Sequence, residues 1–182
     1  ATPRHRAPRR ASLSPGRARG AKPGGRGAAW AALPPERQKL GQEVRVFLPL
    51  YTRVRETAAP GPVLERAVLR LGRLRLEYGV TIARLPGTEL DVWLIDCPPL
   101  YDRDGGPYQD PASGHDWPDN ALRFAALARI AALLAGESSP VAWRPRVLHC
   151  NDWQTALAPA YAHFASGARA ATVTCIHNLA FQ

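Results

Sequence analysis

The sequence of 182 residues contains no methionine, even at position 1, which indicates a processed or partial product. It contains only three cysteines. Cys97, Cys150 and Cys175 lie far apart in apolar segments, a spacing that does not fit a zinc site and that favours buried, reduced thiols. No run of about 18 apolar residues is present, so we expect neither a membrane-spanning helix nor a membrane partner.

A continuous apolar segment of the kind found in secretory signals is also missing. Residues 1–20 are rich in arginine and contain no acidic residue, as organelle transit peptides do. We therefore expect a cytoplasmic protein, with a plastid protein as the alternative.

Acidic residues are nearly absent from residues 1–40, which hold ten Lys and Arg side chains and one acid, Glu36. The rest of the chain holds fourteen basic and fourteen acidic side chains, so the whole net charge of +9 lies in this head. Its Arg, Pro, Gly and Ala content predicts disorder. It has one aromatic residue, Trp30, and no recognisable binding module, so a nucleic-acid partner is not expected. A basic tail that binds nucleic acid stays the alternative.

Regular patterns begin after the head. Residues 43–50 alternate as a strand does, and residues 74–85 are typical of a hairpin that turns or bulges at Gly79. The apolar run 89–97 predicts a strand buried on both faces. The polar stretch 98–117, rich in Gly, Pro and Asp, predicts a long functional loop.

The second half alternates helices and strands. Residues 118–136 predict a helix with Asp116 or Asp119 as its N-cap and Gly136 at its end. The remaining elements are expected to be a strand at 146–150, a helix at 155–165 and a strand at 171–178. Pro159 fits the interior of that helix poorly unless it falls in the first turn. Strands that alternate with helices predict an α/β fold with a Rossmann-like, doubly wound parallel sheet.

Polar clusters follow three of the predicted strands, at the carboxyl ends where parallel sheets bind ligands. The clusters are Tyr101-Asp102-Arg103, Asn151-Asp152 and His177-Asn178. Each has a structural alternative: Asp152 could cap the next helix, His177 could be a core residue, and Asp102 with Asp104 could shape a turn. Trp153 fits packing better than sugar stacking. The convergence of the three clusters predicts a binding site.

Five segments resemble those of bacterial glycogen synthases and plant starch synthases, in the same order along the chain. They are GQEVRVFLPLY (41–51), DCPPLYDRDGGPY (97–108), WPDNALRFAALAR (117–129), WRPRVLHCNDWQTALAPAY (143–161) and TVTCIHNLAFQ (172–182). The resemblance implies a GT-B glycosyltransferase, with two Rossmann-like domains that face a cleft. It divides the chain into the head, 1–40, and a partial N-terminal catalytic domain, 41–182, with no counterpart of the C-terminal nucleotide-sugar domain.

The resemblance also implies the chemistry. The family transfers glucose from ADP-glucose to the non-reducing end of an α-1,4-glucan, with retention and without an essential metal or cofactor. The implied partners are ADP-glucose, which is a substrate, and an α-glucan acceptor. We expect residues 1–182 alone to be inactive because half of the cleft has no counterpart. A non-catalytic glucan-binding relic, and a GT-B enzyme that uses another sugar nucleotide, are the alternatives.

The family's Lys-x-Gly-Gly loop has a partial match in AKPGGRG (21–27), which assigns ADP-glucose contacts to Lys22, Gly24 and Gly25. A lysine ammonium and glycine N–H groups would stabilise the charge that grows on the leaving phosphate. The apolar strand that precedes this loop in the family has no evident match in residues 1–20. A short frameshift or a mispredicted start would explain this head, and we expect the sheet to lack its first strand.

The resemblance places the other candidates in the substrate cleft. Asn151 lies where the family has His or Asn beside the transferred glucose, and its amide suits positioning a hydroxyl group rather than proton transfer. Asp152, His177 and Asn178 would line the cleft, and Tyr101 would be a platform for a sugar ring. No residue is assigned as the catalytic acid, base or nucleophile, and none as a metal ligand.

Overall fold

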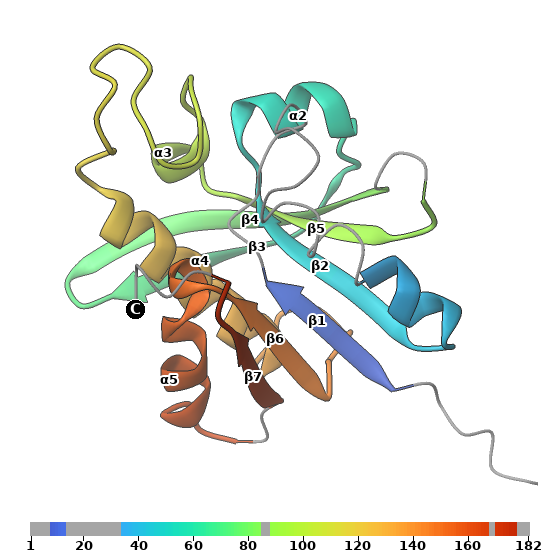
Figure 1. Cartoon of the computed structure of the whole chain (residues 1–182). Helices are drawn as coiled ribbons and strands as arrows, with labels where there is room; N and C mark the ends of the chain where they lie inside the picture. Colours follow the sequence, from blue (N-terminus) through green and yellow to red (C-terminus); the bar gives the residue numbers. More distant parts are fainter. Residues whose placement is uncertain (1–7, 14–33, 85–87, 168–169, 178–182) are drawn as a thin grey trace, which may run out of the picture.

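The computed structural model describes residues 8–13, 34–84, 88–167 and 170–177. They form a seven-stranded sheet in the order β3-β4-β5-β2-β1-β6-β7, flanked by helices (Figure 1). The strands are β1 (Arg9–Leu13), β2 (Glu43–Pro49), β3 (Val63–Leu71), β4 (Leu74–Arg84), β5 (Asp91–Asp96), β6 (Val147–Asn151) and β7 (Ala171–Cys175). The helices are α2 (Thr52–Ala58), α3 (Pro98–Tyr101), α4 (Asn120–Ala135), the short 3₁₀ helix η1 (Trp153–Thr155) and α5 (Leu157–His163).

The sheet is mixed. β5, β2, β1, β6 and β7 pair in parallel, as the alternation of strands and helices predicts. β4 pairs with β5 and with β3 in the antiparallel direction, so a hairpin is added at one side of the parallel sheet. The parallel part carries the α/β character, and antiparallel strands at the edge of such sheets are common.

β1 occupies the centre of the sheet, between β2 and β6 (Figure 1). The predicted disorder of the head is therefore wrong for residues 9–13, and the sheet does not lack this strand. Ala11 and Leu13 are completely buried in the main core, and the backbone is paired on both sides. The sequence RRASL has weak strand propensity. Burial of two apolar side chains and backbone hydrogen bonds to strands on both sides nevertheless stabilise the strand.

The predicted hairpin has different boundaries in the structure. Residues 74–84 form one continuous strand, and the turn lies before it, where Gly72 has a φ of +57°. Gly79 lies inside β4, opposite Arg66 of β3 and Asp96 of β5. A Cβ atom at this position would lie 3.2 Å from Val63 Cγ1, so glycine serves close packing between strands here rather than a turn.

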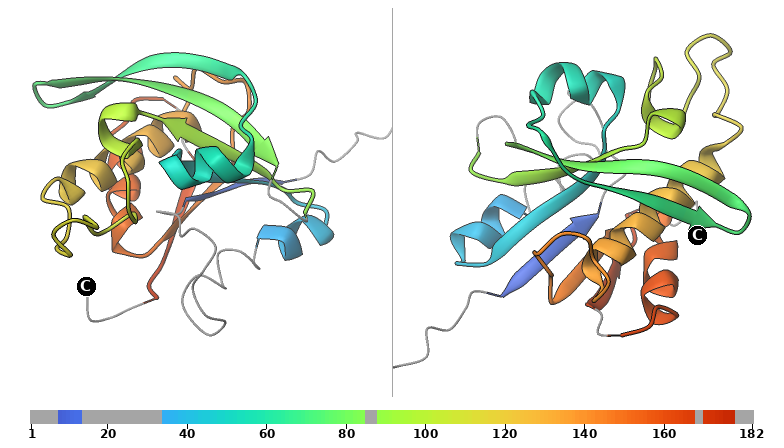
Figure 2. Two further views of the ribbon diagram at one scale, coloured as in Figure 1. Left: turned by 90° about the horizontal axis from the view of Figure 1, so that it is seen from above. Right: turned by 180° about the vertical axis from the view of Figure 1, so that it is seen from behind.

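Helices α4 and α5 pack beside each other on one face of the sheet, as both views of Figure 2 show. This face holds the larger core cluster, which contains Leu13, Trp93, Leu127 and Leu148. The opposite face holds a smaller apolar cluster over β2, β4 and β5, against which α2 packs through Val54 and Ala58. Residues of β1 and β6 that alternate with these core residues therefore face the side of the sheet opposite α4 and α5.

The predicted helices are confirmed with adjusted ends. α4 begins after Asp119 and ends before Gly136, inside the predicted range, but the Asp119 side chain makes no cap hydrogen bond. Residues 155–165 contain the end of η1 and all of α5, with Pro159 in the first turn of α5, where its missing N–H is not needed.

Replacement of Leu13 by alanine tests the place of β1. Because Leu13 is fully buried, Leu13→Ala should lower the free energy of unfolding by about 2–5 kcal/mol. Leu40→Ala is the matched control, since this leucine is 77% exposed, and it should change stability by less than about 0.5 kcal/mol. Urea unfolding followed by circular dichroism measures both. Equal stability of the two variants would contradict a central β1.

Candidate functional site

Asn151 ends β6 at the carboxyl edge of the sheet and joins two neighbouring strands. Its side-chain amide donates to the carbonyl of Leu13 at 2.9 Å and to the hydroxyl of Ser12 at 3.3 Å, both in β1. Its oxygen Oδ1 lies 3.2 Å from Nε2 of His177, which follows β7. Since Oδ1 only accepts, Nε2 of His177 carries the proton. Asn151 and His177, which belong to two of the predicted clusters, are thus brought together at this edge.

Asp152 holds a backbone conformation that few residues other than glycine adopt, with φ of 64° and ψ of −178°. Its carboxylate accepts from the N–H of Trp153 at 3.2 Å, which confirms the helix-cap interpretation. Its own N–H donates to the carbonyl of Cys175 at 2.8 Å, and its carbonyl accepts from the Thr155 hydroxyl at 3.1 Å. Such strain costs about 1–3 kcal/mol and is concentrated at functional sites.

Tyr101 does not join this group. It is completely buried in the main core, its ring meets Tyr51 edge to face, and its hydroxyl donates to the carbonyl of Arg123 at 2.9 Å. Burial raises the pKa of its hydroxyl well above the ordinary value. The prediction of a platform for a sugar ring is therefore wrong, because neither face of the ring is open to a ligand.

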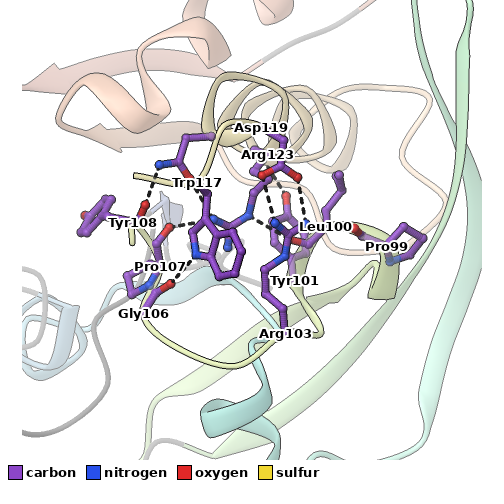
Figure 3. A network of polar contacts seen from close by, with 11 residues as sticks. Pro99, Leu100, Tyr101, Arg103, Gly106, Pro107, Tyr108, Trp117, Asp119 and Arg123 are labelled. Atoms are coloured by element: carbon purple, nitrogen blue, oxygen red, sulfur yellow. Dashed lines mark hydrogen bonds and ion pairs between the residues drawn. The ribbon is translucent and has the colours of Figure 1, made fainter. Parts of the chain in front are cut away.

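Arg123 is the centre of a polar network beneath the predicted loop (Figure 3). The side chain is fully buried, and it donates to the carbonyl groups of Leu100 at 2.8 Å and Pro107 at 3.0 Å, and to Asn120 Oδ1 at 2.8 Å. Burial lowers the pKa of the guanidinium. These contacts attach the loop to the first turns of α4.

Arg103 completes the network (Figure 3). It forms a two-point ion pair with Asp119 at 3.0 and 2.8 Å, and its guanidinium lies 4.7 Å from the centre of the Trp117 ring. Asp102 accepts from the Thr52 hydroxyl at 3.1 Å. The loop 98–117 is therefore held by contacts with α2 and with the start of α4, and the cluster at 101–103 has a structural role.

Trp153 lies beside Asn151 and Asp152 in the chain and keeps 36% of its surface exposed. Its ring meets Phe124 of α4 edge to face at 5.1 Å. The expected packing role is thus present.

Sequence reasoning missed His149, which lies two residues before Asn151 on the same side of β6. Its side chain is 5% exposed, and its Nδ1 lies 3.4 Å from Nη1 of Arg37, in the helical segment 34–39. Burial, followed by the charges of Arg37, His177 and Arg10, lowers the pKa of His149. The period of two along β6 was the signal that could have found it.

Lys22, Gly24, Gly25 and Asn178 lie outside the described residues, so their predicted contacts stay predictions. Within the described ranges, no group of three or more His, Cys, Asp or Glu side chains could hold a metal ion. The same part of the chain contains no helix that is both long enough and apolar enough to cross a membrane.

Comparisons with known proteins identify the family. A profile described as the starch synthase catalytic domain matches residues 13–182, which include β1's last residue and the Lys-x-Gly-Gly stretch. The chain belongs to this family. The seven-stranded sheet is accordingly the Rossmann-like N-terminal half of a GT-B glycosyltransferase fold.

This chain is similar to curated glycogen synthases. It is 51% identical over 165 residues to that of Paramagnetospirillum magneticum and 44% identical over 171 residues to that of Nitrosospira multiformis. Each alignment covers 88% of this chain and 32% of the relative. The chain thus spans about a third of the length of these relatives.

A solved structure shows the same fold. It is the catalytic domain of Starch Synthase IV from Arabidopsis thaliana bound to ADP and acarbose, with a TM-score of 0.70 and 21% identity. The match covers 97% of this chain and 35% of that chain.

The lowered pKa of His149 predicts a pH dependence of stability. The unfolded chain takes up the proton near the ordinary pKa of about 6.5, whereas the folded chain takes it up only at lower pH. Stability should therefore be highest above pH 6.5 and should fall as the pH drops through the folded pKa. Urea midpoints at pH 7.5 and 5.5 measure the loss.

His149→Gln should reduce that loss, because glutamine accepts from Arg37 without taking up a proton. His115→Gln, at an exposed position, is the control and should leave the loss unchanged. An undiminished loss in His149→Gln would show that other groups cause the pH dependence.

Proposed function

We propose that the chain forms part of the substrate cleft of an enzyme that transfers glucose from ADP-glucose to the non-reducing end of an α-1,4-glucan, with retention. The observation that carries the proposal is the Asn151–His177 pair at the carboxyl edge, in a chain of the starch synthase family. Ligands bind at this edge in parallel α/β sheets. That the related Arabidopsis structure holds ADP and acarbose supports the same ligand classes here.

The pair suits recognition of a sugar. Asn151 is 6% exposed and its amide is fixed by β1, so its position is set before a substrate arrives. His177 is half-buried, and when it is neutral with its proton on Nε2, its Nδ1 is an acceptor for a sugar hydroxyl. An amide does not titrate near neutral pH, so Asn151 positions the substrate and transfers no proton.

Charge on the leaving diphosphate grows as the glycosidic bond to glucose breaks. Lys22, with the N–H groups of Gly24 and Gly25, supplies the donors for this charge in our proposal. These residues come after β1 in sequence, beyond residues 14–21, and β1 ends at Leu13, whose carbonyl holds Asn151. No metal or cofactor is required for such stabilisation.

The test measures glucose transfer from ADP-glucose to glycogen by the protein expressed from the full reading frame of its gene. Asn151→Ala should lower kcat/KM at least about tenfold, because a buried positioning group is lost and its partners are left unpaired. Gln109→Ala, at an exposed loop position, should have no effect.

Circular dichroism shows whether each variant keeps the fold. Unchanged glucose transfer by a folded Asn151→Ala variant would show that the Asn151–His177 pair is not part of the site. Transfer from another sugar nucleotide in preference to ADP-glucose would favour a different enzyme of the same fold. Glucan binding with no transfer would favour a binding protein.

A further inference from the structure

A group of basic side chains lies on the sheet face opposite α4. Ala11 and Leu13 of β1 face the main core, so Arg10 and Ser12, which alternate with them, face the other side. His149 of β6 faces that side as well, and Arg37 reaches it from segment 34–39, 3.4 Å from Nδ1 of the histidine.

The two arginines carry like charges on the same side of the sheet, Arg10 from β1 and Arg37 through its contact with His149. Burial, and then the charge of Arg10, lowers the pKa of Arg37. Burial is also the main cause that lowers the pKa of His149, and the charges of Arg37 and Arg10 lower it further. The Arg10 side chain is half-buried, and its Nε is buried without a hydrogen-bond partner in the part of the chain that the structure describes. A buried, unpaired donor on a charged group is costly and calls for an acceptor.

The protein supplies no carboxylate to this group. Within the described part of the chain, no ion pair joins Arg10 or Arg37 to an acid, and Glu36, beside Arg37 in sequence, pairs with Lys39 at 2.7 Å. The residues outside that part, 1–7, 14–33, 85–87, 168–169 and 178–182, include no Asp or Glu at all. Their side chains therefore cannot neutralise the arginines either.

The segment that follows β1 in sequence increases the imbalance. Residues 14–33 connect Leu13 to the helical segment that carries Arg37, and they contain Arg17, Arg19, Lys22 and Arg26 without an acidic residue.

We propose that Arg10, Arg37 and His149 form a binding site for a phosphate-bearing small molecule. Guanidinium groups bind phosphate oxygens through two parallel hydrogen bonds, and the Ser12 hydroxyl on the same face is a further donor. The inference goes beyond the proposed glucose transfer, which assigns no role to these side chains. A nucleotide diphosphate and free phosphate share this chemistry, and the experiment separates them.

The experiment is calorimetric titration of inorganic phosphate into residues 1–182 at pH 7, with sodium chloride at matched ionic strength as the reference. Phosphate should bind with a heat that chloride does not give. Arg37→Gln should weaken binding at least about tenfold, because one charged hydrogen-bonding group is lost while an amide remains to donate to His149. Arg70→Gln, on the exposed side of β3, should bind as the unchanged chain does.

Circular dichroism confirms the fold of each variant, and Arg10→Gln replaces Arg37→Gln if the latter unfolds. Phosphate heats no larger than those of chloride, or equal affinities of the Arg37→Gln, Arg10→Gln and Arg70→Gln variants, would overturn the site.

Titration with ADP identifies the natural source of the phosphate. ADP that binds at least about tenfold tighter than phosphate, and that loses this affinity in Arg37→Gln, shows a nucleotide diphosphate as the ligand. Equal affinities for ADP and phosphate show a free phosphate site. Both results support the proposal, and neither depends on glucose transfer, so the two proposals fail separately.

Discussion

The double ladder of β1 is the interaction on which the rest of the sheet depends. Within the sheet that the described residues form, β1 lies between the β3-β4-β5-β2 side and the β6-β7 side and pairs with both through backbone hydrogen bonds. Its five residues contribute little apolar surface beyond Ala11 and Leu13, so backbone pairing carries much of the connection. The same ladder fixes the register that places the Leu13 carbonyl beside the Asn151 amide.

The candidate site follows from that register. The chain turns sharply where β6 ends at Asn151, and Asp152 makes this turn in a strained backbone conformation. Strain persists only where surrounding contacts over-determine the backbone. Here the contacts come from both directions, since Cys175 of β7 holds the Asp152 N–H and Thr155 holds its carbonyl. The polar side chains at this edge therefore lie in fixed positions without a ligand.

Sequence patterns predicted the elements whose apolar residues are numerous and regular. The run at 89–97 and the helix at 118–136 bury long apolar segments, and periodicity alone predicts them. β1 was missed because its strand state depends on two partner strands rather than on its own residues. Tyr101 was misassigned for a related reason: its position after a strand end is local, whereas its burial depends on Arg123, which is distant in sequence.

The arginine side chains on the two faces of the sheet differ in whether they have an acidic or aromatic partner. On the α4 side, Arg103 has Asp119, Arg123 has carbonyl and amide oxygens for Nε and Nη1, and Arg45 lies 4.9 Å from each of two tryptophan rings. Among the described residues, Nη2 of Arg123 is nevertheless buried without a hydrogen-bond partner, as Nε of Arg10 is. On the other side, Arg37 lies 3.4 Å from His149, and among the described residues neither Arg10 nor Arg37 forms an ion pair with an acid. Both arginines are half-buried, so their charges are partly removed from solvent without an acidic partner in the described part of the chain. A bound phosphate would supply the counter-charge to this group, which lies on the face of the sheet near the start of β1 and β6 rather than at their carboxyl ends.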